Sequence, residues 1–491
     1  MGGGSKGSDE SDAVAEMVWR EEKGVSRKVK AFFAPKKKRS VETKRITMEE
    51  LAKHNKRDDL WICVEGHAYD VTKYVKSHPG GWLPLVNLAG KDVTDAFANY
   101  HPSSVYKYLL PSYYVGKIED YKVSQYVKDH REIRQKLLER GLFETSTSYY
   151  VKYITWYAVL FVSAVYCTLA FESTSMHMLG ASLMALFWQQ FAFFGHDIGH
   201  NAISHDRKKD LWWGILFGNT LGGISLGWWK RSHNVHHIVC NSIENDPDIQ
   251  HMPIFAVTDS IFGKFFSSYH QKWVTTDAAA KFLVSWQHIL FYPVMFFARF
   301  NLYAQSYLLL LSKEYVQFKN MELATLVTFA AWFSAMLATL PSWEERIAYA
   351  VLSHGLAGVL HVQICLSHFS MHTYHGQAYN SDDDEWFRMQ VMTTMNINCS
   401  EWMDWFHGGL QFQIEHHLWP RLPRHNLREA RKYTKALCKK YKIHYHEPGW
   451  FEAQKEMVSA MRDVALKARK LEKGDGGFYQ CRLYDGLNAR G

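Results

Sequence analysis

The apolar residues of this chain are concentrated in long runs. Four runs of about 20 residues with few charges predict membrane-spanning helices. Short polar breaks at 172–175 and 341–346 divide the four runs into two pairs, which indicates two helical hairpins. The four predicted spans cover residues 149–171, 178–195, 323–340 and 347–366.

Two further apolar stretches are interrupted, residues 211–229 by glycines and residues 282–311 by His288, Pro293, Arg299 and Asn301. We expect both to be interfacial or re-entrant segments, with helical hairpins as the alternative. The membrane part is therefore predicted to be all-α, with about four transmembrane helices.

Residues 45–120 have a different pattern, with the short alternations that are typical of a small α+β domain. Thr47 followed by Glu50 at the third helical position predicts an N-capped helix. Two strands joined by a turn and two short helices follow. They are predicted at residues 60–64 and 68–72, and at 83–88 and 93–98.

Composition restricts the function classes. A mean hydropathy of −0.27 means that hydrophobicity must be local if the chain enters a membrane, and 18 Trp and 27 Tyr fit interfacial aromatic belts. The net charge of +8 suits a surface facing anionic lipid. Nucleic-acid binding is not expected, because the basic residues flank apolar segments and form no single patch. Seven scattered cysteines without a CxxC motif argue against a disulfide framework.

His78 and His101 are candidate haem ligands. His78 lies in His-Pro-Gly-Gly, a tight loop that lets a flat ligand approach the backbone, and His101 lies in Asn-Tyr-His-Pro. Two imidazoles on opposite faces of a haem leave no open position for oxygen, so such a haem carries single electrons. The competing interpretation is two surface histidines in loops.

Three histidine clusters are the other candidate site. The spacings His-x3-His and His-x2-His-His each place imidazoles on one helix face. Imidazole-rich sites suit Fe, Zn or Cu. The Glu of zinc hydrolases and the Glu-x-x-His of di-iron bundles do not occur in these clusters, and so many histidines exceed the needs of one metal. The clusters are His196/His200, His233/His236/His237 and Gln413/His416/His417, with His368 as a further candidate.

Four spans would return every cluster to the side of the membrane on which residues 45–120 start. Most Lys and Arg residues lie on that side, so the positive-inside rule places it in the cytosol.

The motifs carry two family resemblances. Residues 61–116 resemble a cytochrome b5 domain, with His-Pro-Gly-Gly in full, which implies that His78 and His101 are the axial ligands of haem b. Residues 61–450 resemble the cytochrome b5-fusion, or front-end, membrane desaturases, most closely plant-type delta-8 sphingolipid and delta-6 acyl-lipid desaturases. The three clusters match the three histidine boxes of that family, including the Gln that begins the third box. Ser367 stands where the plant-type pattern has Asn before His368.

The resemblance implies two non-haem iron ions held by the cluster histidines and His368, with Gln413 as a ligand or an orienting neighbour. It implies oxygen-dependent desaturation of a lipid-linked chain, with electrons from NADH passing through cytochrome b5 reductase and the fused haem. The substrate favoured is the sphingoid base of ceramide, at delta-8. A delta-6 acyl-lipid desaturase is the alternative, followed by a membrane lipid hydroxylase; a non-enzymatic haem carrier would not need the clusters.

The same resemblance implies an endoplasmic-reticulum membrane. The residue patterns and the resemblance together divide the chain into five parts. These are a disordered basic tail (1–44), a cytochrome b5-like domain (45–120), a helical linker (121–148), a membrane desaturase domain (149–450) and a C-terminal cytosolic tail (451–491).

Overall fold

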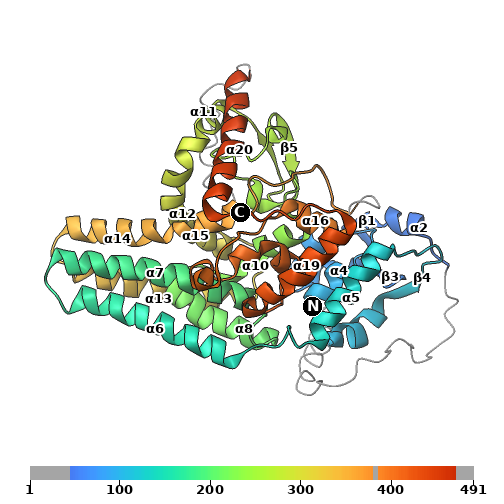
Figure 1. The fold of residues 1–491 in the computed structure, drawn as a ribbon, viewed down its shortest axis with the longest axis horizontal. Coiled ribbons are helices and arrows are strands. Elements are labelled where there is room, and N and C mark those ends of the chain that lie inside the picture. Colours follow the sequence, from blue (N-terminus) through green and yellow to red (C-terminus); the bar gives the residue numbers. More distant parts are fainter. Residues whose placement is uncertain (1–44, 380–384, 472–491) are drawn as a thin grey trace, which may run out of the picture. The chain divides into compact units, whose positions relative to one another are not determined.

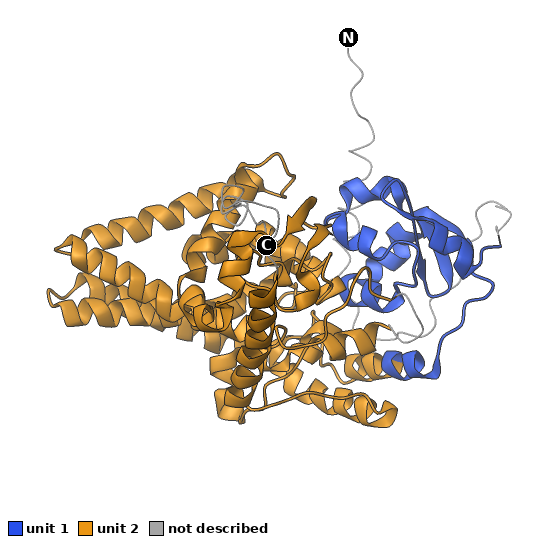
Figure 2. Cartoon of the chain, turned by 90° about the horizontal axis from the view of Figure 1, so that it is seen from above, with its two compact units in different colours: residues 1–131 blue, residues 132–491 orange. Residues whose placement is uncertain are grey.

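The computed structural model describes residues 45–379 and 385–471, so the expected tail at 1–44 and the last residues, 472–491, lie outside the described residues. The chain forms two compact units, residues 1–131 and 132–491 (Figure 2). The boundary between the units falls within helix α5 (Gln125–Glu139).

Unit 1 contains an antiparallel sheet in the order β1-β2-β3-β4, with short helices on its connections. The predicted capped helix is confirmed, since Thr47 Oγ1 accepts from Glu50 N at 3.1 Å. The predicted strand turn is confirmed as well, with Glu65 and Gly66 at φ 53° and 77°. The strands are β1 (Asn55–Lys56), β2 (Asp59–Val64), β3 (His67–Asp70) and β4 (Tyr114–Lys117). The helices are α2 (Met48–Lys53), η1 (Thr72–Ser77), α3 (Leu83–Asn87), α4 (Thr94–Tyr100), η2 (Val105–Leu109) and η3 (Leu110–Tyr113).

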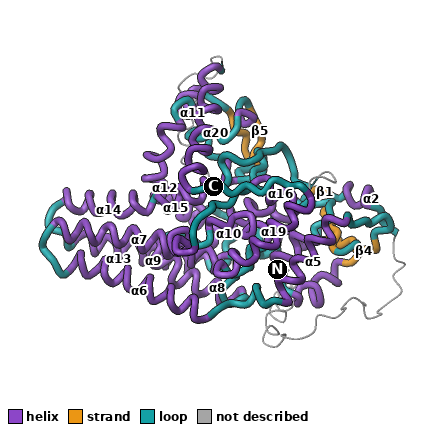
Figure 3. Tube along the Cα trace, in the orientation of Figure 1, coloured by secondary structure: helices purple, strands orange, loops and turns teal. Residues whose placement is uncertain are grey.

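The described residues of unit 2 form helices and one short β-hairpin (Figure 3). Its long helices are α6 (Thr147–Leu169), α7 (Thr174–Gly199), α10 (Leu226–Val239), α12 (Gln287–Leu311), α13 (Lys319–Ala338), α14 (Trp343–Ala357), α19 (Leu427–Tyr441) and α20 (Trp450–Lys470). Its shorter helices are α8 (Arg207–Trp213), η4 (Gly214–Asn219), α9 (Thr220–Gly222), η5 (Pro247–Ile249), η6 (Asp259–Ile261), α11 (Ala278–Val284), α15 (Val359–Leu366), α16 (Trp386–Thr393), η7 (Glu401–Met403), α17 (Asp404–His407), η8 (Leu410–Phe412), α18 (Gln413–Leu418) and η9 (Arg424–Asn426). The hairpin is β5 (Lys264–Ser267) with β6 (Lys272–Thr275).

The predicted hairpins form one bundle. α7 packs against α6 and α14, and α13 also contacts α6 and α14. The connections α6–α7 and α13–α14 lie together at the left end of Figure 1. Apolar side chains on the outside of α6, among them Val159 and Val162, are half or more exposed, as a lipid-facing surface requires.

Five helices, one more than expected, are long and apolar enough to cross a membrane: α6, α7, α12, α13 and the α14–α15 pair. The additional helix is α12, which is continuous over 25 residues although Pro293 lies inside it. The sequence predicted an interrupted segment here, because Pro, Arg and Asn break the apolar run. Packing overrides those breaks: Arg299 is buried, and its guanidinium donates to the hydroxyl of Tyr303 at 2.7 Å.

The other interrupted stretch, 211–229, consists of α8, η4, α9 and the start of α10. Gly223, at φ 75°, ends α9, and a Cβ there would lie 2.5 Å from the Phe329 ring. Trp212, Trp213, Leu216 and Phe217 are each more than 40% exposed, so this part of the chain presents an apolar surface next to α13.

Candidate metal and haem sites

The first histidine cluster lies at the end of α7. His196 is in the last turn, and His200 is the C-cap, whose N–H donates to the His196 carbonyl at 3.1 Å. Gly199 allows α10 to approach this turn, because a Cβ at Gly199 would lie 2.0 Å from the Trp229 ring. The small residue therefore brings the first cluster close to the helix that carries the second.

The second cluster occupies one side of α10. Ser225 caps this helix by accepting from Trp228 N at 3.0 Å, and the buried Glu322 carboxylate accepts from Gly227 N at 3.0 Å. A carboxylate at a helix N-terminus is favoured by the exposed N–H groups and by the helix dipole. This capping fixes the start of the helix that presents His233, His236 and His237.

The third cluster lies on the short helix α18, which buried polar contacts hold in place. Glu415 accepts from Asn396 Nδ2 at 2.7 Å and from the Tyr445 hydroxyl at 2.9 Å, and Asn396 Oδ1 accepts from Ile414 N at 2.9 Å. Burial raises the pKa of Glu415 to about 7. Gln413 is buried at the first position of α18.

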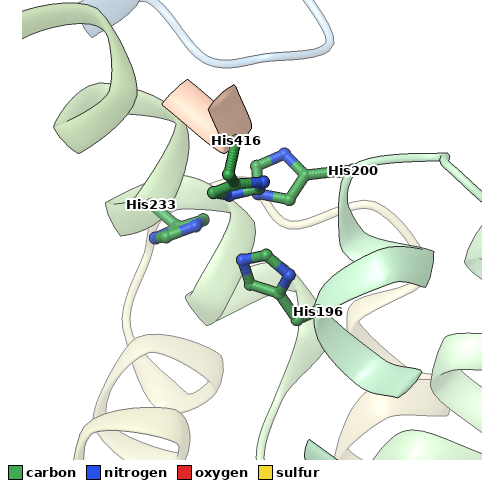
Figure 4. A group of neighbouring side chains, drawn as sticks. All are labelled: His196, His200, His233 and His416. Atoms are coloured by element: carbon green, nitrogen blue, oxygen red, sulfur yellow. The ribbon is translucent and has the colours of Figure 1, made fainter. Parts of the chain in front are cut away.

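The histidines form two groups of potential ligands, each with one ligand atom per residue and all atoms within 4.8 Å of one another. The first group is His196, His200, His233 and His416 (Figure 4). The second is His236, Cys240, His368 and His417. Chain segments more than 200 residues apart therefore meet, as the predicted site requires.

His237 lies between the two groups. Its Nε2 is 3.0 Å from His233 Nε2, and its ring stacks on that of His417 with centroids 4.1 Å apart. Burial, together with the neighbouring imidazoles, lowers the pKa of His237 and of His417 well below the usual value. Both rings are therefore neutral, the form that binds metal.

Polar neighbours orient several rings. His236 Nδ1 donates to Asp246 at 2.9 Å, and His417 Nδ1 donates to Gln390 Oε1 at 3.0 Å. Burial lowers the pKa of His236, but Asp246 and Asp248 outweigh it and raise the pKa to about 9. Such outer hydrogen bonds fix the ring orientation and leave the other ring nitrogen to face the site. At His236 a metal ion must displace a proton from that nitrogen to bind.

The donor set fits bound metal. Within the described residues, Nε2 of His196, His200, His416 and His417 is buried and has no hydrogen-bond partner. A buried polar atom without a partner costs about 1–3 kcal/mol, so converging unpaired nitrogens are unfavourable without a ligand. A metal ion accepts their lone pairs and removes that cost.

Sequence reasoning missed Cys240 and the residues that hold the rings. Cys240 follows His236 by four positions, a helical spacing that could have indicated a shared face. No local signal identifies Gln390, because it reaches His417 only through the tertiary fold.

His78 and His101 face each other in unit 1, with ring centroids 6.0 Å apart. His78 Nδ1 donates to the Gly81 carbonyl at 2.8 Å, and His101 Nδ1 donates to the Phe97 carbonyl at 3.0 Å. Both bonds place the lone pair on Nε2. Two iron–nitrogen bonds of about 2 Å plus the two ring radii span about 6 Å, so the separation fits an iron between the rings.

Comparisons with known proteins agree with this geometry. Residues 173–449 match the fatty acid desaturase family, and residues 47–119 match the cytochrome b5-like haem/steroid binding domain. The chain is 41% identical over 424 residues to Delta(8)-fatty-acid desaturase 2 of Arabidopsis thaliana, covering 86% of this chain and 94% of the relative. It is 41% identical over 430 residues to the acyl-lipid (9-3)-desaturase of Borago officinalis, covering 88% and 95%. It is 37% identical over 420 residues to the Delta 8-(E)-sphingolipid desaturase of Lachancea kluyveri, covering 82% and 72%.

The chain therefore belongs to the fatty acid desaturase family and carries a cytochrome b5-like domain at its N-terminal side. It is a desaturase, an oxidoreductase of lipid metabolism. The family implies iron, and the cytochrome b5-like domain implies haem and electron transfer. The predicted resemblance and fold class are confirmed, and the long apolar helices fit a membrane protein.

Proposed function

We propose that the two ligand groups hold two non-haem iron ions. His196, His200, His233 and His416 hold the first, and His236, His368 and His417 hold the second, with His237 and Gln413 beside them. The observation that carries this proposal is the convergence of the ligand atoms into two groups. Within the described residues, three buried ring nitrogens of the first group and one of the second, His417 Nε2, have no hydrogen-bond partner. When bound, the iron pair supplies the reducible metal that activates O2 for removal of hydrogen from an unactivated chain.

The chain's own residues orient and shield this site. Asp246 holds the His236 ring and Gln390 holds the His417 ring, so each presents one fixed nitrogen. Both rings are fully or nearly buried. A site closed to bulk water protects reactive states from side reactions.

In the same proposal His78 and His101 bind haem b as its two axial ligands. A haem with both axial positions filled transfers electrons and does not bind O2. The electrons come from NADH by way of cytochrome b5 reductase and pass one at a time through the haem.

The proposed substrate is a lipid-linked chain, namely the sphingoid base of ceramide, with the new double bond at delta-8. The names of the Arabidopsis and Lachancea relatives support this position. The Borago relative, named as an acyl-lipid desaturase and also 41% identical, supports the alternative of delta-6 or related front-end desaturation of an acyl lipid. A membrane lipid hydroxylase ranks third, because the third cluster begins with Gln413 and not with His.

We further propose an endoplasmic-reticulum location with the histidine clusters and the haem domain in the cytosol. This orientation uses four crossings, α6, α7, α13 and α14–α15. In this proposal α12 does not cross, because a fifth crossing would separate ligand residues that meet in the structure. The connections α6–α7 and α13–α14 are short, and most Lys and Arg residues lie elsewhere in the chain. The positive-inside rule assigns such short, cation-poor loops to the lumen.

Expression in yeast with fed fatty acids, followed by mass-spectrometric mapping of double bonds in sphingoid bases and acyl lipids, tests the function. A new bond at carbon 8 of the long-chain base is the expected result. A new double bond between the carboxyl end and an existing acyl double bond would contradict the sphingoid-base proposal and support the acyl-lipid alternative. A hydroxylated product would reject desaturation as the main activity. A variant with His200→Ala is the control, because it removes a proposed iron ligand.

A further inference from the structure

Cys240 lies inside the second ligand group. It is the C-cap of α10, four residues after His236, and its side chain is 3% exposed. Its Sγ lies 3.5 Å from His368 Nδ1, and its sulfur and the ligand nitrogens of His236, His368 and His417 are all within 4.8 Å of one another. The thiol is thus placed among imidazoles that converge on one point.

The two groups differ in their donors. The first offers four imidazoles, whereas the second offers three, and Cys240 takes the fourth place. His417 Nε2 is buried and, within the described part of the chain, has no hydrogen-bond partner, which independently indicates a ligand at this position. Gln413 stands in the third cluster where a histidine would have added a further nitrogen.

We propose that Cys240 is a sulfur ligand of the second iron. This inference rests on the proposed two-iron function and adds one ligand to it. Binding breaks the S–H bond, forms a metal–sulfur bond and releases the proton to solvent, with no change in oxidation state. The charge of a bound metal ion is sufficient to deprotonate a coordinating thiol. The two irons then differ, one with nitrogen donors alone and the other with a thiolate, which stabilises the more oxidised metal.

The alternative to metal binding is a purely structural role for Cys240. Its thiol donates to the Thr393 carbonyl at 3.7 Å, and in this role it would only hold His368 in position. The two roles differ in one observable, a direct metal–sulfur bond.

X-ray absorption at the cobalt edge separates these roles. The full-length, haem-containing protein is loaded with Co(II) in place of non-haem iron, so that the haem iron does not contribute. We expect two cobalt ions per chain and a sulfur neighbour at about 2.3 Å. Because only one of the two ions binds sulfur, the average is one sulfur neighbour for every two cobalt ions. Cys240→Ala should lose the sulfur neighbour, and so should the sterically closer Cys240→Ser.

Cys365→Ala is the matched control. Cys365 lies three residues before His368 on α15 and is not in the ligand group, so this variant should keep the sulfur neighbour. Two bound cobalt ions with nitrogen neighbours only, in the unsubstituted protein, would overturn the sulfur ligand and leave the two-metal function standing. A failure to bind cobalt at all would overturn both. The unsubstituted spectrum decides the point even if a cysteine variant does not fold.

Discussion

Arg424 and Asp197 form a buried ion pair that connects two of the histidine clusters. Arg424 Nε lies 3.2 Å from Asp197 Oδ2, and the two side chains are only 3% and 6% exposed. Asp197 lies between His196 and His200, and Arg424 follows the third cluster by seven residues. The Nε–H of Arg424 makes no hydrogen bond to the carboxylate, so this contact is an ion pair and not a hydrogen bond.

Replacing Arg424 by Met leaves the buried Asp197 carboxylate without its arginine partner, close to the Tyr150 hydroxyl, which donates to it at 2.8 Å, and to His196 Nδ1 at 3.8 Å. Removing one partner of a buried pair costs about 3–5 kcal/mol. At about 2 °C per kcal/mol for a large domain, the thermal midpoint of unit 2 should fall by about 6–10 °C. Because the pair anchors the first cluster, non-haem iron should also be lost.

Thermal unfolding in detergent, followed by tryptophan fluorescence, with metal analysis of the same samples, provides the assay. Asp197→Asn combined with Arg424→Met should cost less than the sum of the single changes, by at least about 1 kcal/mol. Arg428→Met is the matched control, because its partner Asp404 is 37% exposed and such pairs contribute about 0–1 kcal/mol. Strict additivity, or an Arg424→Met midpoint within about 2 °C of the original protein, would refute the reasoning.

Other predictions concern the haem, the metal and pH. His78→Ala should convert the haem from six-coordinate low-spin to five-coordinate high-spin in its absorption spectrum, with non-haem iron unchanged. Gln390→Leu removes the acceptor of His417 Nδ1 and should weaken non-haem metal binding about 10–100-fold in chelator competition, whereas Gln390→Glu, which keeps an acceptor, should weaken it less. Burial lowers the pKa of His205 from 6.5 to about 4, so the unfolded chain binds more protons between these values, and the stability that His205 contributes above pH 6.5 is lost as pH falls towards 4. At pH 5 the loss is about 2 kcal/mol; in His205→Gln the thermal midpoint should therefore fall less between pH 7 and pH 5, and an unchanged pH profile would contradict the assignment.

Local signals predicted the parts of the fold that local interactions determine. The Thr47 cap, the turn at Glu65 and Gly66, and the α6–α7 and α13–α14 hairpins all follow from short-range patterns, and the structure has each of them. The continuity of α12 could not be predicted in the same way. Its buried Arg299 contacts Tyr303 in the same helix, but it also contacts the Gly222 carbonyl and the Trp188 ring, and these two partners come from distant segments.

In the candidate site, too, local patterns predicted some features and the tertiary fold determines others. The spacing of the histidines predicted which residues would gather, since i,i+3 and i,i+4 positions share a helix face. It could not predict how they divide into two groups, because His416 and His417 are adjacent in sequence and yet fall into different groups. That division depends on the rotation of α18, which Glu415 and its partners Asn396 and Tyr445 hold.

The C-terminal half of α7 explains how the first and third clusters are brought together. Gln189 and Gln190, two polar residues within the apolar sequence of α7, donate to the carbonyls of residues 406 and 405 at 2.8 and 2.9 Å. Gly408, at φ 58°, packs against Phe193, where a Cβ would lie 2.0 Å from the ring. The same helix then ends in the first cluster, so the segment leading into the third cluster is held by the element that carries the first.

This arrangement accounts for polar residues in a helix that is apolar enough to span a membrane. An amide in an apolar environment is unfavourable unless it is hydrogen-bonded. Gln189 donates one N–H to Gln363 Oε1 at 2.9 Å, and its other N–H reaches the residue-406 carbonyl only when the 405–406 segment is in place. The cost of leaving it unpaired therefore favours the one arrangement in which the clusters meet. Hydrophobic matching alone would allow this segment to slide along α7, whereas hydrogen bonds of fixed geometry do not, and the register of the metal ligands follows from them.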